Sequence, residues 1–188
     1  MWQEALAVPG RLRIDRDSTL RTGTLYAADS QFVVRDGRVT VAVPGHNPLL
    51  VLGFDVYGQS AARSAAVLRD LGFPGGPVRE GVWQGQPVWI VGGRGPADLR
   101  SAQYWVEKDR LLFVRLLEPT AGDTARTTDI RFLDYRPAGG GWVAARVEAY
   151  TGPTRTLVEE YDGVRADVEL DPALFEAKKW TTARHWRR

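Results

Sequence analysis

Residues 31–43 read QFVVRDGRVTVAV, and their pattern predicts a β-hairpin. β-Branched and apolar side chains fill two short runs, Gln31–Val34 and Val39–Val43, on either side of Asp36 and Gly37. An Asp-Gly pair favours the two-residue type I′ turn, because both central residues of that turn need a positive φ. The two runs are therefore expected to pair as neighbouring antiparallel strands.

The period of two continues toward the N-terminus. Leu12 and Ile14 alternate with Arg11, Arg13 and Asp15, which predicts a strand with one buried apolar face and one solvated charged face. The aspartates in this stretch are therefore interpreted as surface residues.

The first strand of the chain is expected to end at Val8, with Trp2, Leu6 and Val8 on its core face around Glu4. This strand would form an exposed edge of the sheet. Because an exposed edge carries unpaired backbone groups, an oligomer formed through it is one expected assembly.

Further strand-like runs are bounded by turn residues. They are Gly23–Ala28, Pro87–Val91, Ala102–Glu107, Leu111–Leu117, Thr128–Tyr135, Trp142–Tyr150 and Thr156–Val164. Short connections between consecutive strands predict an antiparallel meander of about eight to ten strands.

Two helical segments are expected after the predicted hairpin. Asn47 is a good N-cap and Pro48 suits the first helical position, and the segment Pro48–Tyr57 is apolar on nearly every face. The second helix, about Ser60–Leu71, carries Ala61, Ala65, Leu68 and Leu71 on one stripe and ends at Gly72.

The run Leu111–Leu117 is apolar on both faces, which a sheet with one wet face does not need. One face carries Leu112, Val114 and Leu116, and the other carries Leu111, Phe113 and Leu117 with Arg115. Two interpretations stay open: a central strand covered on both sides, or a sheet curled around a cavity that accepts an apolar ligand.

Composition excludes several classes of protein. The 188 residues include no Cys and two His, which removes thiol chemistry and leaves little for metal binding. The net charge is +2, but residues 178–188 carry five cations and no acid, so the rest of the chain is mildly acidic. Nucleic-acid binding is therefore not expected. We expect one domain over residues 1–177 and a basic tail over 178–188, with no transmembrane span.

No motif in the chain predicts catalysis. The run Gly92–Pro96 lacks the spacing and the following helix of a phosphate loop, and Ser60 is interpreted as a helix cap. His46 has no acidic neighbour in the sequence, and the paired carboxylates, Asp15 with Asp17 and Glu159 with Glu160, are interpreted as solvated strand residues. We expect no enzyme activity, no cofactor and no metal.

Taken in order, several segments resemble the LolA-like family of outer-membrane lipoprotein carriers. They are Trp2 to Pro9, Leu25 to Ser30, Asp36-Gly37, Asn47 to Leu50, Tyr104 to Leu111, and Val168 to Phe175. The resemblance implies an α+β, mostly β fold: a curved antiparallel sheet, or incomplete barrel, with a two-helix insertion acting as a lid. It also implies a non-enzymatic periplasmic protein that binds acyl chains of lipoproteins or other lipids.

The chain departs from the family pattern in two respects. It begins at about the third strand, without a signal peptide, so it resembles an N-terminally incomplete member. Val8 precedes Pro9, where lipoprotein carriers have an Arg that ties down the lid. These differences favour a relative of the LolA-like family whose ligand the sequence does not identify. The absence of Cys is equally compatible with a periplasmic and with a cytoplasmic location.

The sequence thus predicts binding or transport of an apolar acylated ligand in the bacterial cell envelope. The resemblance places the lid at Leu50, Leu52, Phe54 and Tyr57. Apolar strand faces suggest a sheet lining of Ile90, Tyr104, Val114, Leu116, Phe132 and Val147. The alternative is a structural or sensor domain whose concavity is filled by its own side chains and which binds an envelope protein partner.

Overall fold

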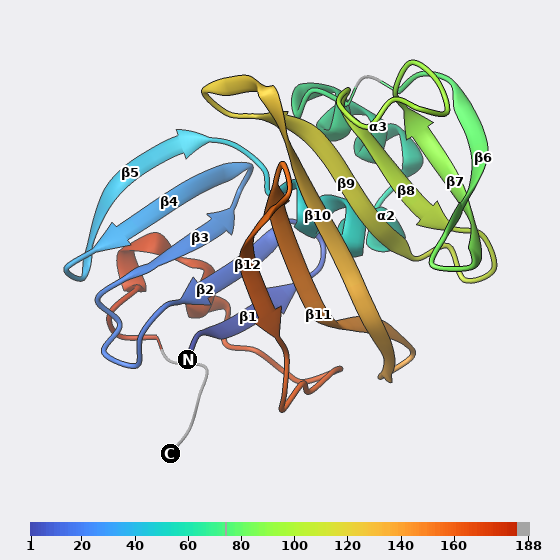
Figure 1. Ribbon diagram of the computed structural model, residues 1–188. Coiled ribbons are helices and arrows are strands. Elements are labelled where there is room, and N and C mark those ends of the chain that lie inside the picture. The colour runs from blue at the N-terminus through green and yellow to red at the C-terminus, as the bar shows by residue number, and fades with distance from the viewer. Residues whose placement is uncertain (74, 184–188) are drawn as a thin grey trace. The chain divides into compact units, whose positions relative to one another are not determined.

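The computed structural model describes residues 1–73 and 75–183 (Figure 1). The chain divides into two compact units, one made of Met1–Leu71 with the residues from Glu169 onward, and the other of Gly72–Val168. The second unit is therefore inserted between two segments of the first. The predicted single domain over residues 1–177 includes both units, and its extent stays a prediction.

The predicted fold class is confirmed. The described residues are mostly strands, every strand pairing is antiparallel, and the helical insertion follows the fifth strand. The strands form two open sheets, with five strands in the first unit and seven in the second. Among the described residues, no helix is long and apolar enough to cross a membrane.

The first unit contains a five-stranded meander whose spatial order follows the chain. Its strands are β1 (Gln3–Ala7), β2 (Arg11–Asp15), β3 (Gly23–Ala27), β4 (Ser30–Arg35) and β5 (Arg38–Pro44). Asp36 and Gly37 have φ values of 51° and 73°, so the predicted type I′ hairpin is confirmed. As predicted, the first strand lies at an edge of the sheet.

The helical insertion begins where the sequence predicts. It consists of α1 (Pro48–Leu50), a π-helical turn η1 (Val51–Asp55), α2 (Val56–Gly58) and α3 (Ala61–Asp70). The Asn47 side chain accepts hydrogen bonds from the backbone N–H groups of Leu49 and Leu50, and Ser60 accepts one from Arg63. Both caps are confirmed, because each satisfies N–H groups that the first turn leaves unpaired.

The predicted buried stripe of α3 is correct at Leu68 and wrong at Ala61 and Ala65. Ser64, Val67 and Leu68 are buried, whereas Ala61 and Ala65 are exposed. The two alanines offer little apolar area, so burying Val67 beside Leu68 removes more surface from water.

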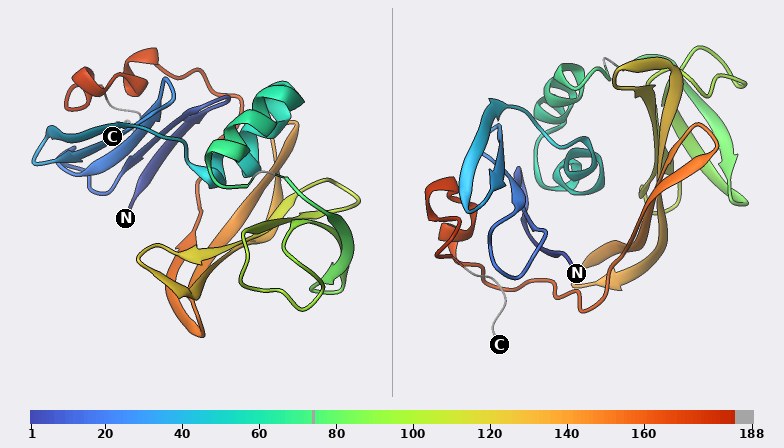
Figure 2. Two further views of the ribbon diagram at one scale, coloured as in Figure 1. Left: turned by 90° about the horizontal axis from the view of Figure 1, so that it is seen from above. Right: turned by 60° about the vertical axis from the view of Figure 1, so that its left-hand side comes forward.

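A C-terminal segment covers one face of the five-stranded sheet (Figure 2). It contains two short 3₁₀ helices, η2 (Pro172–Phe175) and η3 (Ala177–Lys179), followed by Trp180. The core of this unit lies beneath the segment. It consists of Ala5, Leu20, Leu25, Ala27, Val34, Leu174, Phe175, Trp180 and Ala183.

The covered face is the one that the sequence pattern assigned to solvent. Arg13 and Asp15 are fully buried on it, whereas on the opposite face Leu12 is buried as predicted and Ile14 is half-buried. The face predicted for the first strand is also wrong, because Ala5 is buried while Trp2 and Val8 are exposed. Local alternation identifies two faces but does not say which one the C-terminal segment covers.

The second unit contains a seven-stranded meander, again ordered as in the chain. Its strands are β6 (Val78–Trp83), β7 (Gln86–Gly92), β8 (Gln103–Glu107), β9 (Phe113–Thr120), β10 (Asp123–Ala138), β11 (Gly141–Thr151) and β12 (Thr154–Glu160). The central strand β9 is buried at every position from Phe113 to Leu117. This burial on both faces agrees with the two-sided apolar pattern, whereas Leu111, predicted to lie in the same strand, lies outside β9 and is exposed.

Candidate functional site

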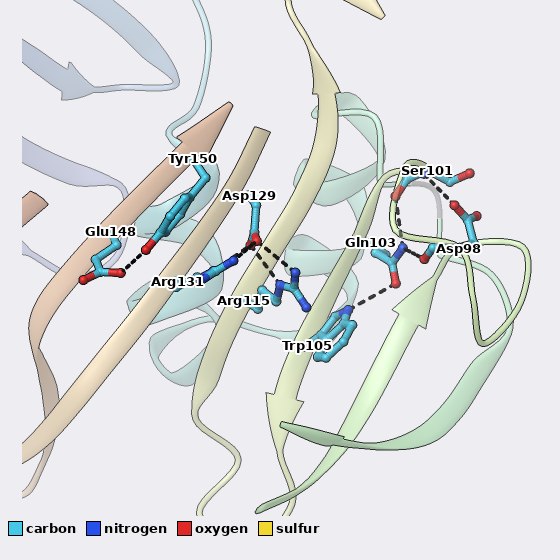
Figure 3. Close-up of polar contacts among 9 residues, drawn as sticks. All are labelled: Asp98, Ser101, Gln103, Trp105, Arg115, Asp129, Arg131, Glu148 and Tyr150. Atoms are coloured by element: carbon cyan, nitrogen blue, oxygen red, sulfur yellow. Dashed lines mark hydrogen bonds and ion pairs between the residues drawn. The ribbon is translucent and has the colours of Figure 1, made fainter. Parts of the chain in front are cut away.

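One face of the seven-stranded sheet carries a row of polar and aromatic side chains, which we call the polar row (Figure 3). Residues opposite one another in paired strands share a face of the sheet. By this rule the row runs across four strands through Trp105, Arg115, Arg131 and Glu148. Asp129 lies on the same face, two residues before Arg131.

Asp129 is the centre of the polar row. Arg115 donates to both of its carboxylate oxygens from Nε and Nη2, each at 2.8 Å. Arg131 donates from Nε at 3.0 Å and from Nη2 at 2.7 Å. Burial alone would raise the pKa of Asp129, but the hydrogen bonds and charges of the two guanidinium groups outweigh it and hold the pKa below its usual range.

Aromatic rings cover the cations of the row. The guanidinium of Arg115 lies 4.5 Å from the ring centre of Trp83 and 4.6 Å from that of Trp105. The two indole rings meet edge to face at 5.6 Å. Contact with aromatic faces offsets part of the cost of removing a guanidinium from water. The middle of this face is therefore filled by the protein's own side chains.

The row ends at Gln103, which is completely buried. Its Oε1 accepts hydrogen bonds from Trp105 Nε1 at 3.1 Å and from Arg79 Nη2 at 2.9 Å, and its Nε2 donates to the carbonyl oxygen of Asp98 at 2.6 Å. The buried amide is thus satisfied at both ends, which makes this part of the row a structural element.

The Asp98 carboxylate holds the conformation of the loop that contains the glycine-rich run Gly92–Pro96. It accepts backbone hydrogen bonds from Arg94, Arg100 and Ser101, which hold its pKa far below the usual range. The loop therefore turns its N–H groups toward its own carboxylate instead of an external phosphate. The rejection of a phosphate loop at Gly92–Pro96 rests on this geometry as well as on spacing.

A hollow of about 170 Å³ adjoins the polar row and is formed entirely by the second unit. Its apolar and aromatic walls come from Trp83, Val88, Val114, Phe132, Leu133 and Tyr135. Its polar lining consists of Gln84, Gln86, Glu107, Arg110 and Asp134. The lining is therefore mixed, with six apolar or aromatic residues and five polar or charged ones.

The charged groups of the hollow are anchored by neighbours. Glu107 is buried and accepts hydrogen bonds from the backbone N–H of Asp109 at 2.6 Å and from Arg110, both N–H and Nε, at 3.2 Å. Burial would raise the pKa of Glu107, but these donors together lower it. The Arg110 guanidinium stacks on Trp142 at 4.7 Å from the ring centre.

The predicted lining residues are divided between the two faces of the sheet. Val114 and Phe132 border the hollow. Ile90 lies opposite Trp105 and so belongs to the face of the polar row. Tyr104, Leu116 and Val147 lie on the other face. Tyr104 pairs with Leu116, and each is next in sequence to a residue of the polar row. Val147 likewise precedes Glu148 and pairs with Phe132. The alternation on each strand was visible in the sequence, whereas the register between strands was not.

The predicted lid residues belong to the first unit. Leu50 and Leu52 are buried, Phe54 is half-buried, and the Tyr57 side chain is exposed. The predicted lining residues belong to the second unit. That these two sets form one site stays a prediction.

A second and much smaller cavity lies in the first unit, beside His46. It has a volume of about 10 Å³, which is room for about one water molecule. His46 Nδ1 is 3.8 Å from Asp29 Oδ1, and Asp29 also accepts a 2.6 Å hydrogen bond from Arg63. Asp55, another wall of this cavity, accepts a hydrogen bond from the Gly10 N–H at 2.9 Å, and burial raises its pKa.

The neighbours of His46 were missed because Asp29 and Asp55 are distant from it in sequence. Ser30 lines the same cavity, but its hydroxyl donates to the carbonyl oxygen of Ala28 at 3.2 Å, and among the described residues no hydrogen bond joins it to His46. Within residues 1–73 and 75–183, no group of three or more His, Cys, Asp or Glu side chains could hold a metal ion.

Sequence reasoning also missed the polar row and Arg110. One signal for the row was present, because Arg115 interrupts an otherwise apolar strand and a buried cation needs a carboxylate partner. Nothing in the sequence indicates that this partner is Asp129, or that Trp83 lies over the pair.

Comparison of the chain with protein-family models, with curated proteins and with solved structures finds no match. The LolA-like resemblance therefore stays a prediction.

Proposed function

We propose that this protein binds an apolar ligand, such as an acyl chain, and performs no chemistry on it. The observation that carries the proposal is the hollow, whose walls include Val88, Val114 and Leu133. Its volume of about 170 Å³ is close to that of an engineered cavity of about 150 Å³ that binds benzene, but that cavity is lined only by apolar side chains, whereas the hollow has both apolar and polar walls. One end of an acyl chain would fill such a space, gaining about 0.8 kcal/mol for each buried methylene group.

The state of the nearby carboxylates supports a binding function. Asp129 is held by four hydrogen bonds from two arginines, and Glu107 is held by three donors. Both have lowered pKa values, whereas a general acid or base works best with a pKa near the operating pH. These carboxylates are therefore suited to structure and poorly suited to proton transfer.

The test is displacement of a fluorescent fatty acid from the purified protein. Gln86 borders the hollow and is exposed, so Gln86→Trp should obstruct the hollow without disturbing the core and weaken binding at least tenfold. Thr156→Trp, at an exposed position of β12, is the matched control and should leave binding unchanged. No binding by the unmodified protein, or equal binding by the Gln86→Trp variant, would contradict the proposal.

A second candidate is a structural or sensor domain that binds a protein partner. The observation favouring it is the stack of Trp83, Arg115 and Trp105, which fills the middle of the sheet face. Mass spectrometry of lipids extracted from the native protein separates the two candidates. Acyl chains that copurify support the carrier function, and their absence together with a captured envelope protein supports the sensor function.

The location in the bacterial cell envelope, in the periplasm, is part of the first proposal. It rests on the resemblance described above and on the acyl ligand that the hollow would accept. Fractionation of cells that express the full gene tests it directly, because a protein found only in the cytoplasmic fraction could not act on envelope lipids.

A further inference from the structure

We propose that the ligand of the hollow is a free carboxylic acid whose carboxylate is received by Arg110. This inference rests on the proposed function and narrows it from acyl chains in general to unesterified acids. It depends on the position of Arg110 at the hollow, on how its guanidinium is held, and on which of its donors remain unused.

Two contacts fix the orientation of the Arg110 guanidinium. Its Nε donates to Glu107 Oε2 at 3.2 Å, and its plane lies over the Trp142 ring at 4.7 Å from the ring centre. A guanidinium that is already oriented loses less conformational freedom when it binds a ligand. Arg110 is therefore preorganised, although its side chain is still 42% exposed to solvent.

The outer half of this guanidinium is available. Arginine has five N–H donors in a planar fork, and the contact with Glu107 uses the single donor on Nε. Within residues 1–73 and 75–183, the two terminal NH₂ groups of Arg110 have no hydrogen-bond partner. Two parallel N–H donors match the two oxygens of a carboxylate, which is the strongest common geometry for such a pair.

Glu107 does not compete for these donors. Its carboxylate is buried and already accepts hydrogen bonds from two backbone N–H groups and from Arg110 Nε. The other carboxylate at the hollow, Asp134, is paired with Arg146 at 2.9 Å. Asp134 is thus paired with a cation outside the hollow, and Glu107 engages Arg110 only through Nε, so a ligand carboxylate would share the Arg110 cation with Glu107 by binding its two terminal NH₂ groups.

The size of the hollow limits the apolar part of the ligand. A cavity of about 150 Å³ accepts a benzene molecule, so a hollow of about 170 Å³ accepts an apolar group of about six to eight carbons. With the carboxylate at Arg110, the carbon chain would enter between Val88, Val114 and Leu133. The inferred ligand class is a monocarboxylate with an apolar body of this size, either aliphatic or aromatic.

Isothermal titration calorimetry with octanoate and methyl octanoate tests the inference. The two probes share the same chain and differ in the charge of the head group. We expect octanoate to bind about tenfold more tightly, since a charge-assisted hydrogen-bond pair is lost in the ester. Arg110→Gln should abolish this difference by weakening octanoate about tenfold while leaving methyl octanoate unchanged.

Two further variants complete the experiment. Arg100→Gln removes an exposed cation from the loop that precedes β8 and should leave both affinities unchanged. Arg110→Lys keeps the charge but not the fork, and should recover only part of the octanoate affinity. Equal affinity for octanoate and its ester in the unmodified protein would overturn the acid inference and leave the proposed function standing. Failure of both probes to bind would overturn the proposed function itself.

Discussion

The two units of the molecule bury the same combination of side chains on a sheet face, with different results. In the first unit, Arg13 and Asp15 form a two-bond ion pair at 2.9 and 3.0 Å, and the Arg13 guanidinium lies 4.1 Å from the centre of the Trp180 ring. In the second unit, Arg115 forms a two-bond pair with Asp129 and lies under Trp83. Both arrangements satisfy a buried cation with a carboxylate and an aromatic ring.

The difference lies in what the remaining donors bind. Arg13 also donates to the carbonyl oxygens of Leu174 at 3.4 Å and Trp180 at 2.9 Å, so the pair attaches the C-terminal segment to the sheet. In the second unit, Asp129 is shared by two arginines, and the contacts stay within the sheet. The Arg13–Asp15 pair therefore binds the segment that covers its face, whereas the Arg115–Asp129 pair binds only side chains of its own sheet.

The largest expected effect follows from removing Arg13. Arg13→Gln leaves Asp15 buried without its cation and two carbonyl oxygens without a donor, so we expect the free energy of unfolding to fall by about 3–5 kcal/mol. Chemical denaturation measures this change. Arg38→Gln, at an exposed position of β5 in the same sheet, is the control and should change stability by less than about 1 kcal/mol. Similar small effects for both variants would contradict the anchoring role.

A smaller loss is expected for the corresponding change in the second unit. Asp129→Asn removes the shared carboxylate and leaves the buried Arg115 without its anion. The amide oxygen of Asn can still accept a hydrogen bond, and Arg131, whose side chain is 28% exposed, regains water, so we expect a loss of about 2–3 kcal/mol. The exposed Asp123→Asn on the same strand serves as control. A loss equal to or greater than that of Arg13→Gln would contradict the expected difference between the two pairs.

The pH dependence of the Asp129→Asn effect follows from the lowered pKa. A carboxylate whose pKa is lower in the folded state contributes stability that is complete above its unfolded pKa, about 4. This contribution is lost as the pH falls through the folded value. The stability difference between the unmodified protein and the variant should therefore be constant from about pH 5 to 8 and shrink below about pH 4.

Each unit also contains a hairpin turn with a glycine at positive φ. The central residues are Asp36-Gly37 in the first unit and Gln84-Gly85 in the second, with φ between 50° and 80°. Gly37→Ala and Gly85→Ala should each cost about 1 kcal/mol, measured by thermal unfolding. We expect the larger loss at Gly37, because an added Cβ would lie 3.2 Å from Thr181, whereas Gly85 has nothing within 4 Å. The reverse order would contradict close packing of the C-terminal segment.

The smallest expected effect concerns Asp55, a buried carboxylate of the first unit. Burial raises its pKa, although the Gly10 N–H and the nearby His46 oppose the shift. Its contribution to stability is therefore complete below about pH 4 and is lost as the pH rises through the folded value. Asp55→Asn keeps an acceptor for Gly10 and should be more stable at pH 7 by less than about 1 kcal/mol, with the gain absent at pH 3. Loss of stability at pH 7 would show that the charge is needed.

Local features of this fold were predictable because short-range rules determine them. The Asp36-Gly37 turn, the Asn47 and Ser60 caps, and the Gly72 helix end depend on backbone conformations that few residues adopt. The two-sided burial of β9 was readable from its apolar pattern. Of the candidate site, only Val114 and Phe132 were anticipated at the hollow, because a strand's faces are evident from its sequence but its register is not.

The amino-acid sequence by itself therefore determined most of the antiparallel strands, although not β6, together with their turns and the helix boundaries, since each depends on residues within a few positions of one another. Only the tertiary structure decided that the charged face of β2 is buried, because the covering Trp180 is 167 residues from Arg13. The same holds for the hollow, where Trp83, Arg110 and Val114 come from different strands and turns. Burial depends on which distant segments pack against a face, and a local pattern contains no information about that choice.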